Sequence, residues 1–115
     1  MTENKKTVLQ YMDGFRTSDH EKILSCLTET IFWEMPGFFQ LAGKEAFDKE
    51  IENDQFEGRP DIEIIRLVEE NNIVIAEGTV KSKFKDGNLL DAVFCDVFQM
   101  ENSKIKQLTT YQANK

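Results

Sequence analysis

The chain has 115 residues, the usual size of one domain, and folding such a chain buries about two thirds of its extended surface. Apolar residues make up 40% of it and nine residues are Phe, which supplies enough hydrophobic surface to exclude intrinsic disorder. With 14 basic and 21 acidic residues, the formal charge of −7 repels a phosphate backbone. We therefore expect a single domain over residues 1–115 and no nucleic-acid partner.

The sequence also lacks the long apolar runs of a signal peptide or a membrane span, which predicts a cytoplasmic protein without membrane contacts. Cys26 and Cys95 are isolated thiols without C-x-x-C spacing or a companion His cluster, so both are interpreted as reduced packing residues. There is no glycine-rich phosphate loop and no ligand-spaced cluster of His, Cys and carboxylates. We expect no metal and no cofactor.

The first segment has the apolar spacing of an amphipathic helix, carried by Val8, Tyr11, Met12 and Phe15. The pattern stops near residues 16–19. There, Ser18 followed by Glu21 matches a capping box for a second, short helix.

Residues 28–35 are rich in β-branched and aromatic side chains and predict a strand that Pro36 and Gly37 close. Alternation places Ile31, Trp33 and Met35 on one face of this strand. After a loop over residues 37–43, the spacing predicts a helix over residues 44–56, ended by Gly58, Arg59 and Pro60.

The rest of the chain predicts four strands, over residues 61–70, 73–84, 89–100 and 104–111, separated by short turn signals such as Asn71-Asn72 and Asp86-Gly87. Helices gathered at the start and a meander after them are typical of the α+β class. We therefore predict three N-terminal helices packed on a curved antiparallel sheet.

Asp96 is the most unusual residue in these strands. Alternation places it on one strand face with apolar neighbours: Leu90, Ala92, Phe94, Phe98 and Met100. A carboxyl in such surroundings loses hydration, so it either finds hydrogen-bond donors or becomes protonated.

The element order resembles the NTF2-like family, which includes SnoaL-like and ketosteroid-isomerase-like proteins. Four landmarks carry the resemblance: Tyr11 in the first helix, Asp19 after its end, Pro36 closing the first strand, and Asp96. The resemblance covers nearly the whole chain and implies a cone-shaped α+β fold. That fold occurs in isomerases, hydrolases, dehydratases, cyclases and plain binding or scaffolding domains, so the fold alone does not identify the function.

In ketosteroid isomerase, a Tyr and a protonated Asp hold the enolate oxygen, and the resemblance implies Tyr11 and Asp96 as the matching, catalytic pair. The family's general base is an Asp directly before the Pro that closes the first strand. Here that residue is Met35, which accepts no proton, and loss of a general base costs about 10²–10⁴-fold in rate. Epoxide-hydrolase relatives use an Asp-Arg-Asp arrangement in the sheet, and residues 73–84 and 89–100 contain no Arg.

Six residues are predicted to line a ligand pocket: Trp33, Met35, Phe38, Phe94, Phe98 and Glu77. Each also has a structural interpretation, because aromatic and Met clusters are more often core, and Tyr11 and Asp96 are equally well explained as packed, mutually satisfied side chains. His20, the only histidine, lies between two acidic residues and is a weak candidate for catalysis.

Three hypotheses follow. The leading one is binding of a small apolar molecule with one polar oxygen, in a pocket anchored by Tyr11 and Asp96. The second is a pocket enzyme of the isomerase, dehydratase or cyclase type. The third is a dimeric scaffold or partner-binding module, because relatives pair through their sheets and the other face of the penultimate strand is apolar: Val93, Cys95 and Val97. A homodimer is expected.

Overall fold

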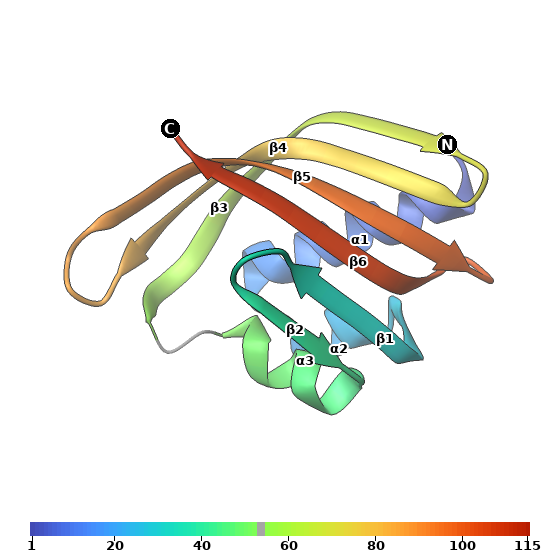
Figure 1. Cartoon of the computed structure of the whole chain (residues 1–115), viewed down its shortest axis with the longest axis horizontal. Coiled ribbons are helices and arrows are strands. Elements are labelled where there is room, and N and C mark those ends of the chain that lie inside the picture. Colours follow the sequence, from blue (N-terminus) through green and yellow to red (C-terminus); the bar gives the residue numbers. More distant parts are fainter. Residues whose placement is uncertain (53–54) are drawn as a thin grey trace.

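The computed structural model describes residues 1–52 and 55–115, which form three helices and six strands. The helices are α1 (Glu3–Thr17), α2 (His20–Leu24) and α3 (Lys44–Ile51). The strands are β1 (Leu27–Met35), β2 (Phe39–Ala42), β3 (Phe56–Glu70), β4 (Ile73–Phe84), β5 (Leu89–Glu101) and β6 (Lys104–Asn114). They form one sheet in the order β2-β1-β6-β5-β4-β3, whose long strands curve around the helices (Figure 1). The α+β class is as predicted.

The sheet is not wholly antiparallel, which corrects the prediction. β1 runs parallel to β6, whereas the other neighbouring strands are antiparallel. The helices are also not all N-terminal, because α3 follows β1 and β2 in the chain, and α2 has only five residues. Local hydrophobic periodicity does not predict either feature, because strands that are distant in sequence become neighbours only through tertiary packing.

Two boundaries also differ from the prediction. Within the expected loop, Phe39–Ala42 forms strand β2, which folds back on β1 through a turn closed by the Phe38 amide donating to the Met35 carbonyl (2.9 Å). The predicted helix over residues 44–56 ends at Ile51. Residues 53–54 of that prediction lie outside the described residues, and residues 58–60, expected to stop the helix, lie within β3.

The junction between α1 and α2 is capped differently from the predicted capping box. Ser18 adopts a left-handed conformation (φ 53°) and closes the end of α1 with its backbone amide. The cap of α2 is instead Asp19, whose carboxylate accepts a hydrogen bond from the Lys22 amide (3.1 Å). The Ser18–Glu21 box is therefore wrong by one residue, because the reversal between the helices uses Ser18.

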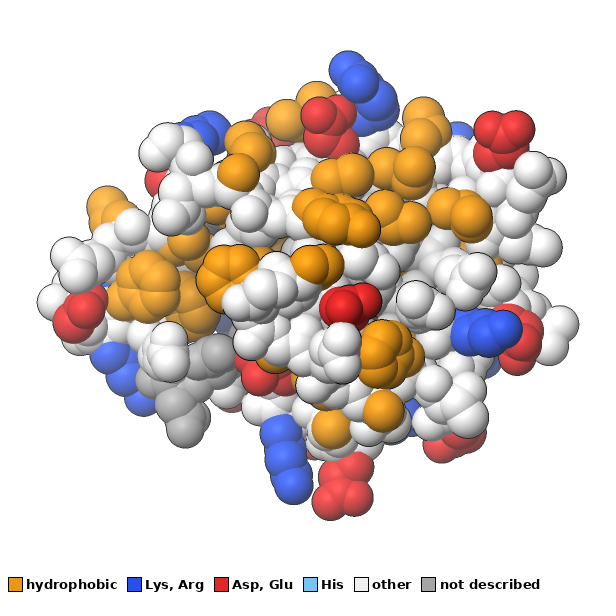
Figure 2. All heavy atoms as spheres, in the orientation of Figure 1, with side chains coloured by type: hydrophobic (Ala, Val, Ile, Leu, Met, Phe, Trp, Pro, Cys, Tyr) orange, Lys and Arg blue, Asp and Glu red, His pale blue; other side chains and the backbone are white. Residues whose placement is uncertain are grey.

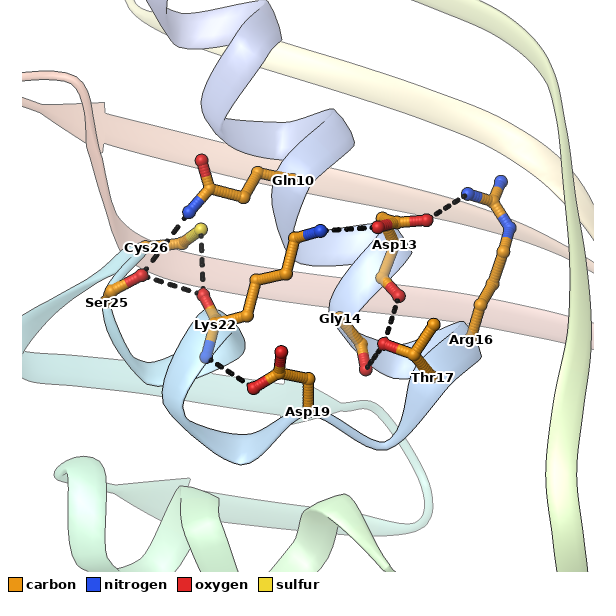
Figure 3. Close-up of polar contacts among 9 residues, drawn as sticks. All are labelled: Gln10, Asp13, Gly14, Arg16, Thr17, Asp19, Lys22, Ser25 and Cys26. Carbon is orange, nitrogen blue, oxygen red and sulfur yellow. Dashed lines mark hydrogen bonds and ion pairs between the residues drawn. The ribbon is translucent and has the colours of Figure 1, made fainter.

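The same junction holds α2 tightly against α1 (Figure 3). Lys22 Nζ lies 2.5 Å from Asp13 Oδ2, and Asp13 also pairs with Arg16. Gly14 makes the close approach possible, because a Cβ there would lie 2.6 Å from Ile23 Cγ1. These contacts hold the C-terminal turn of α1 against α2.

The hydrophobic core lies between the helices and the concave face of the sheet. Its largest fully buried side chains are Phe47, Phe98, Ile23, Leu27, Ile31, Ile105, Leu108, Val8 and Val74. Phe47 of α3 is central: its ring stacks on Trp33 (centroids 4.8 Å apart) and meets Tyr11 and Phe15 edge-on. This aromatic cluster separates the core from the open end of the cone.

The convex face of the sheet carries a second group of apolar side chains, which we call the outer patch (Figure 2). Its members are Ile65, Val68, Ile75, Val93, Cys95, Val97 and Tyr111. Ile65, Val68, Val93 and Tyr111 are exposed, and Figure 2 shows hydrophobic side chains gathered on this face over β4, β5 and β6. In the part of the chain that the structure describes, no helix is long and apolar enough to cross a membrane.

Candidate functional site

An open cavity of about 1260 Å³ lies at the end of the cone, between the inner face of the sheet, the end of α3 and the turn between β1 and β2. Trp33, Met35 and Phe38 all lie on it, and Phe38 stands 75% exposed at its rim. Much of the remaining wall is apolar, with Phe15, Phe39, Ile51, Phe56, Val80, Phe84, Leu89 and Leu90. Such a surface favours a ligand that is largely apolar.

Asp96 lies on the inner face of β5, opposite Ala76 of β4 and Thr110 of β6, and is only 7% exposed. Burial raises the pKa of Asp96 to about 7, and a hydrogen bond with the Thr110 side chain partly opposes this rise. Its Oδ1 atom is buried without a hydrogen-bond partner. A carboxyl in this state gains and loses its proton near neutral pH.

Tyr11 of α1 lies under the same part of the sheet but is 2% exposed, with its ring edge-on to Phe15, Phe47 and Phe98. Burial, and then the negative charge of Asp96, raises the pKa of Tyr11 well above its ordinary value. The two side chains expected to act together are therefore neighbours. No hydrogen bond joins them among the described contacts, and neither lines the cavity.

Thr110 lies between the buried carboxyl and the cavity, and it is not among the site residues predicted from the sequence. Its side chain lines the cavity, and its Oγ1 accepts a hydrogen bond from Trp33 Nε1 (3.0 Å). The same side chain lies directly opposite Asp96 in the strand register, and it is the polar group that partly lowers the pKa of that carboxyl. No sequence signal marks Thr110 for this role, because its position opposite Asp96 follows from the strand register. Trp33, Thr110 and Asp96 thus form a polar network at the base of an apolar cavity.

Glu77 does not enter the cavity, which corrects the prediction. Ala76, its neighbour in β4, pairs with Asp96 on the inner face, so Glu77 points to the convex face, where it pairs with Cys95. Its carboxylate forms an ion pair with Arg66 of β3 (3.4 Å). Glu77 therefore belongs to the surface that surrounds the outer patch.

Phe94 and Phe98 lie on the inner face, as the alternation predicts, but they are core residues rather than cavity residues. Phe98 is fully buried against Tyr11. Phe94 is 7% exposed and packs against Gly78, where a Cβ would lie 2.9 Å from the Phe94 ring. The polar residue that lines this part of the cavity is therefore Thr110 on β6, and not Asp96 on β5.

His20 connects α2 to α3. Its Nδ1 lies 2.5 Å from Asp48 Oδ1 and its Nε2 lies 2.8 Å from Glu52 Oε1, and hydrogen bonds to these two carboxylates raise the pKa of His20. Glu52 lines the cavity, but His20 does not. Within residues 1–52 and 55–115, no group of three His, Cys, Asp or Glu side chains is arranged to hold a metal ion.

A curved sheet that wraps three helices and opens into an apolar cavity defines a cone-shaped α+β domain built around a ligand-sized space. Residues 8–108 match the family model of the SnoaL-like domain, and the chain belongs to this family. No curated protein matches the chain significantly.

Solved structures with this fold include Bal32a from a soil-derived mobile gene cassette, which is 19% identical with a TM-score of 0.87 over 96% of this chain and 88% of that one. An LEH-like epoxide hydrolase of M. tuberculosis is 17% identical, with a TM-score of 0.85 over 96% and 83% of the two chains. TerC, co-crystallised with polyporic acid, is 19% identical, with a TM-score of 0.84 over 99% and 92%. At these identities the likeness shows the fold alone.

Proposed function

We propose that this protein binds a small, largely apolar molecule that carries one polar oxygen. The observation that carries the proposal is an open cavity in which a group of aromatic and aliphatic side chains lies next to the buried polar group formed by Trp33, Thr110 and Asp96. Apolar walls supply affinity, and one polar group in such a wall fixes the orientation of the ligand. Asp96, and behind it Tyr11, support that group from the core.

The cavity surface argues against the standard isomerase reaction. Met35 lies on the cavity at the position where the resemblance would require a basic carboxylate. The neighbouring carboxylate, Glu34, faces the other way and accepts a hydrogen bond from Gln40 Nε2 (2.9 Å). Proton abstraction by the family mechanism therefore lacks its base, whereas ligand binding loses nothing.

A pocket enzyme of the isomerase, dehydratase or cyclase type is the second candidate function, and the state of Asp96 favours it. A carboxyl with a pKa of about 7 is suited to general acid or base catalysis at neutral pH. Two structural neighbours are an LEH-like epoxide hydrolase and TerC co-crystallised with polyporic acid, so the same fold occurs both in an enzyme and in a complex with a small molecule. Conversion of a bound ligand that Asp96→Asn abolishes would establish this candidate.

Saturable binding of small phenols and naphthols is the expected result of the direct test. Trp33 is the sole tryptophan and lines the cavity, so its fluorescence reports binding, with calorimetry as a second readout because these ligands also absorb light. Thr110→Val keeps the shape of the side chain but removes its hydroxyl, and we expect about tenfold weaker binding, the effect of one hydrogen bond.

The matched control is Val93→Thr, the reverse exchange of the same two isosteric side chains on the exposed convex face, and it should bind like the wild type. Equal affinity of Thr110→Val and wild type would show that the polar network does not contact the ligand. Failure of every aromatic ligand to bind at millimolar concentration would refute the proposal and favour the scaffold hypothesis.

We also propose that the outer patch is covered by a second copy of the chain. Val93 and Tyr111 on this patch are 40% and 53% exposed, and a contiguous exposed apolar surface on a sheet is typical of an interface. Sedimentation at micromolar concentration is expected to show a dimer, and Val93→Lys is expected to shift it to monomer. Phe38→Lys makes the same kind of change on the cavity rim and should leave the dimer intact; a monomeric wild type contradicts the proposal.

A further inference from the structure

Building on the proposed function, we propose that Thr110 is the polar group that contacts the ligand and that the protonation state of Asp96 reverses the direction of its hydrogen bond. With Asp96 neutral, the cavity offers a hydrogen-bond donor and selects ligands with a carbonyl or ether oxygen. With Asp96 ionised, it offers an acceptor and selects ligands with an O–H or N–H group.

The hydrogen-bond inventory of Thr110 forces this reversal. A threonine hydroxyl has one hydrogen to donate and two lone pairs that accept. The Trp33 indole N–H is a donor only, so the 3.0 Å contact between Trp33 Nε1 and Thr110 Oγ1 occupies one lone pair. One donor and one acceptor remain on Thr110. One of the two is used by Asp96 and the other faces the cavity. If Asp96 accepts the Thr110 hydrogen, the ligand meets an acceptor, and if Asp96 donates to Thr110, the ligand meets a donor.

An ionised Asp96 can only accept, so it takes the Thr110 hydrogen and leaves the second lone pair of Thr110 facing the cavity. A neutral Asp96 carries one proton, which lies on one of its two carboxyl oxygens. Oδ1 is buried without a partner, so a proton there would be an unsatisfied buried donor. The proton is therefore favoured on Oδ2, where it donates to Thr110 and releases the Thr110 hydrogen toward the ligand.

The groups around Asp96 leave it as the one that titrates in this neighbourhood near neutral pH. Burial raises the pKa of Tyr11 from α1, of Cys26 before β1, and of Cys95 on the same strand, so all three stay protonated and uncharged. On β4 the residue opposite is Ala76, which has no charge. The aromatic side chains that β1 and α3 contribute to this core are likewise uncharged.

The remaining source of pH dependence is the set of charged residues that line the cavity: Glu50, Glu52, Arg59, Asp91 and Lys115. Asp91 is paired with Lys115 (3.7 Å), and Glu52 is paired with His20. His20 titrates above its ordinary pKa, since Asp48 and Glu52 stabilise its charged form. His20→Gln is therefore the control that separates a rim effect from the Asp96 effect.

Three uncharged probes of similar size test the proposal, because none of them titrates between about pH 5 and about pH 9. The probes are 2-acetylnaphthalene, which only accepts, indole, which only donates, and naphthalene, which does neither. We expect affinity for 2-acetylnaphthalene to fall about tenfold and affinity for indole to rise about tenfold as pH increases through about 7, the pKa of Asp96. Naphthalene binding should not change.

The variants locate the effect. Asp96→Asn should bind all three probes with affinities that do not depend on pH. Thr110→Val should bind 2-acetylnaphthalene and indole with similar affinity. His20→Gln should show the same pH-dependent reversal as the wild type. The ligand-free protein gives a second readout, because its single indole N–H belongs to Trp33 and contacts Thr110. Its NMR resonance should shift with pH around a midpoint near 7, and this shift should vanish in Asp96→Asn.

The outcomes separate this inference from the proposed function. If no probe binds the wild type, both are overturned. If naphthalene binds but the ketone and indole show parallel pH profiles, or the reversal persists in Asp96→Asn, the cavity binds ligands and the switch is wrong. A Trp33 resonance that does not move between about pH 5 and about pH 9 overturns the switch independently of any ligand.

Discussion

Asp96→Asn is expected to remove a large part of the pH dependence of stability between about pH 4 and about pH 7. The native pKa of Asp96 is about 7, whereas an exposed aspartate titrates near 3.9. Across that window the folded state retains a proton that the unfolded state has lost, so the free energy of unfolding falls as pH rises. Three pKa units correspond to about 4 kcal/mol. At about pH 8 the variant should therefore be more stable than wild type by an amount of this order.

The measurement is urea unfolding of both proteins at a series of pH values, with the difference between them as the readout. Below about pH 4 the carboxyl is protonated in both states and the two proteins should be similarly stable. His20 also loses stabilising contacts as pH rises through its raised pKa, but this contribution is common to both proteins and cancels. Parallel stability profiles would mean that Asp96 is ionised in the fold at an ordinary pKa.

Phe47→Ala is expected to be the most damaging simple truncation, costing about 3–5 kcal/mol in the free energy of unfolding. Phe47 is fully buried and its ring contacts Trp33, Tyr11 and Phe15, which belong to two different elements. Removing the ring leaves a cavity at the place where α3 packs on the sheet and α1. Because Trp33 stacks on Phe47, its fluorescence in the folded variant should also change.

Chemical denaturation monitored by circular dichroism gives the stability of this variant without relying on Trp33. Lys49→Ala, on the exposed face of the same helix, should change stability by less than about 0.5 kcal/mol. Phe47→Leu should lie between the two. A loss below about 1 kcal/mol for Phe47→Ala would show that α3 contributes little to the core and that the wall beside the cavity is loosely held.

Membership of the SnoaL-like family places this chain among domains that share a cone and differ in chemistry. In this chain, Met35 and Thr110 line the cavity, whereas Asp96 lies behind Thr110 and does not reach it. Because Met35 accepts no proton, the proposed function is recognition of a polar oxygen and not removal of a proton from carbon.

Periodicity alone determined the secondary structure of most of the chain and the face on which several side chains lie. The spacing of Val8, Tyr11 and Met12 predicted the buried stripe of α1, and alternation in β5 placed Asp96 and Phe98 on the inner face. These predictions hold because the hydrophobic pattern of a helix or a half-buried strand depends only on residues that are close together in the sequence. The resemblance, carried by four landmarks, then identified the family.

Only the tertiary structure decided the strand pairing, and the pairing determines which threonine lies beside Asp96 and the cavity. Counting back from the Glu101–Lys104 turn would place Thr109 opposite Asp96, but a bulge near Met100 shifts the register by one and brings Thr110 there instead. A shift of one residue exchanges the two faces of a strand, so no local pattern reveals which threonine reaches the cavity.

The same limit explains the other corrections. The parallel pairing of β1 with β6 joins residues more than seventy positions apart, and it is this pairing that brings Trp33 within hydrogen-bond distance of Thr110. The outward direction of Glu77 follows from the pairing of Ala76 with Asp96. The sequence by itself therefore determined the class of fold and the unusual carboxyl. Only packing between distant segments decided which side chains surround that carboxyl and which ones line the cavity, because such contacts depend on register and not on periodicity.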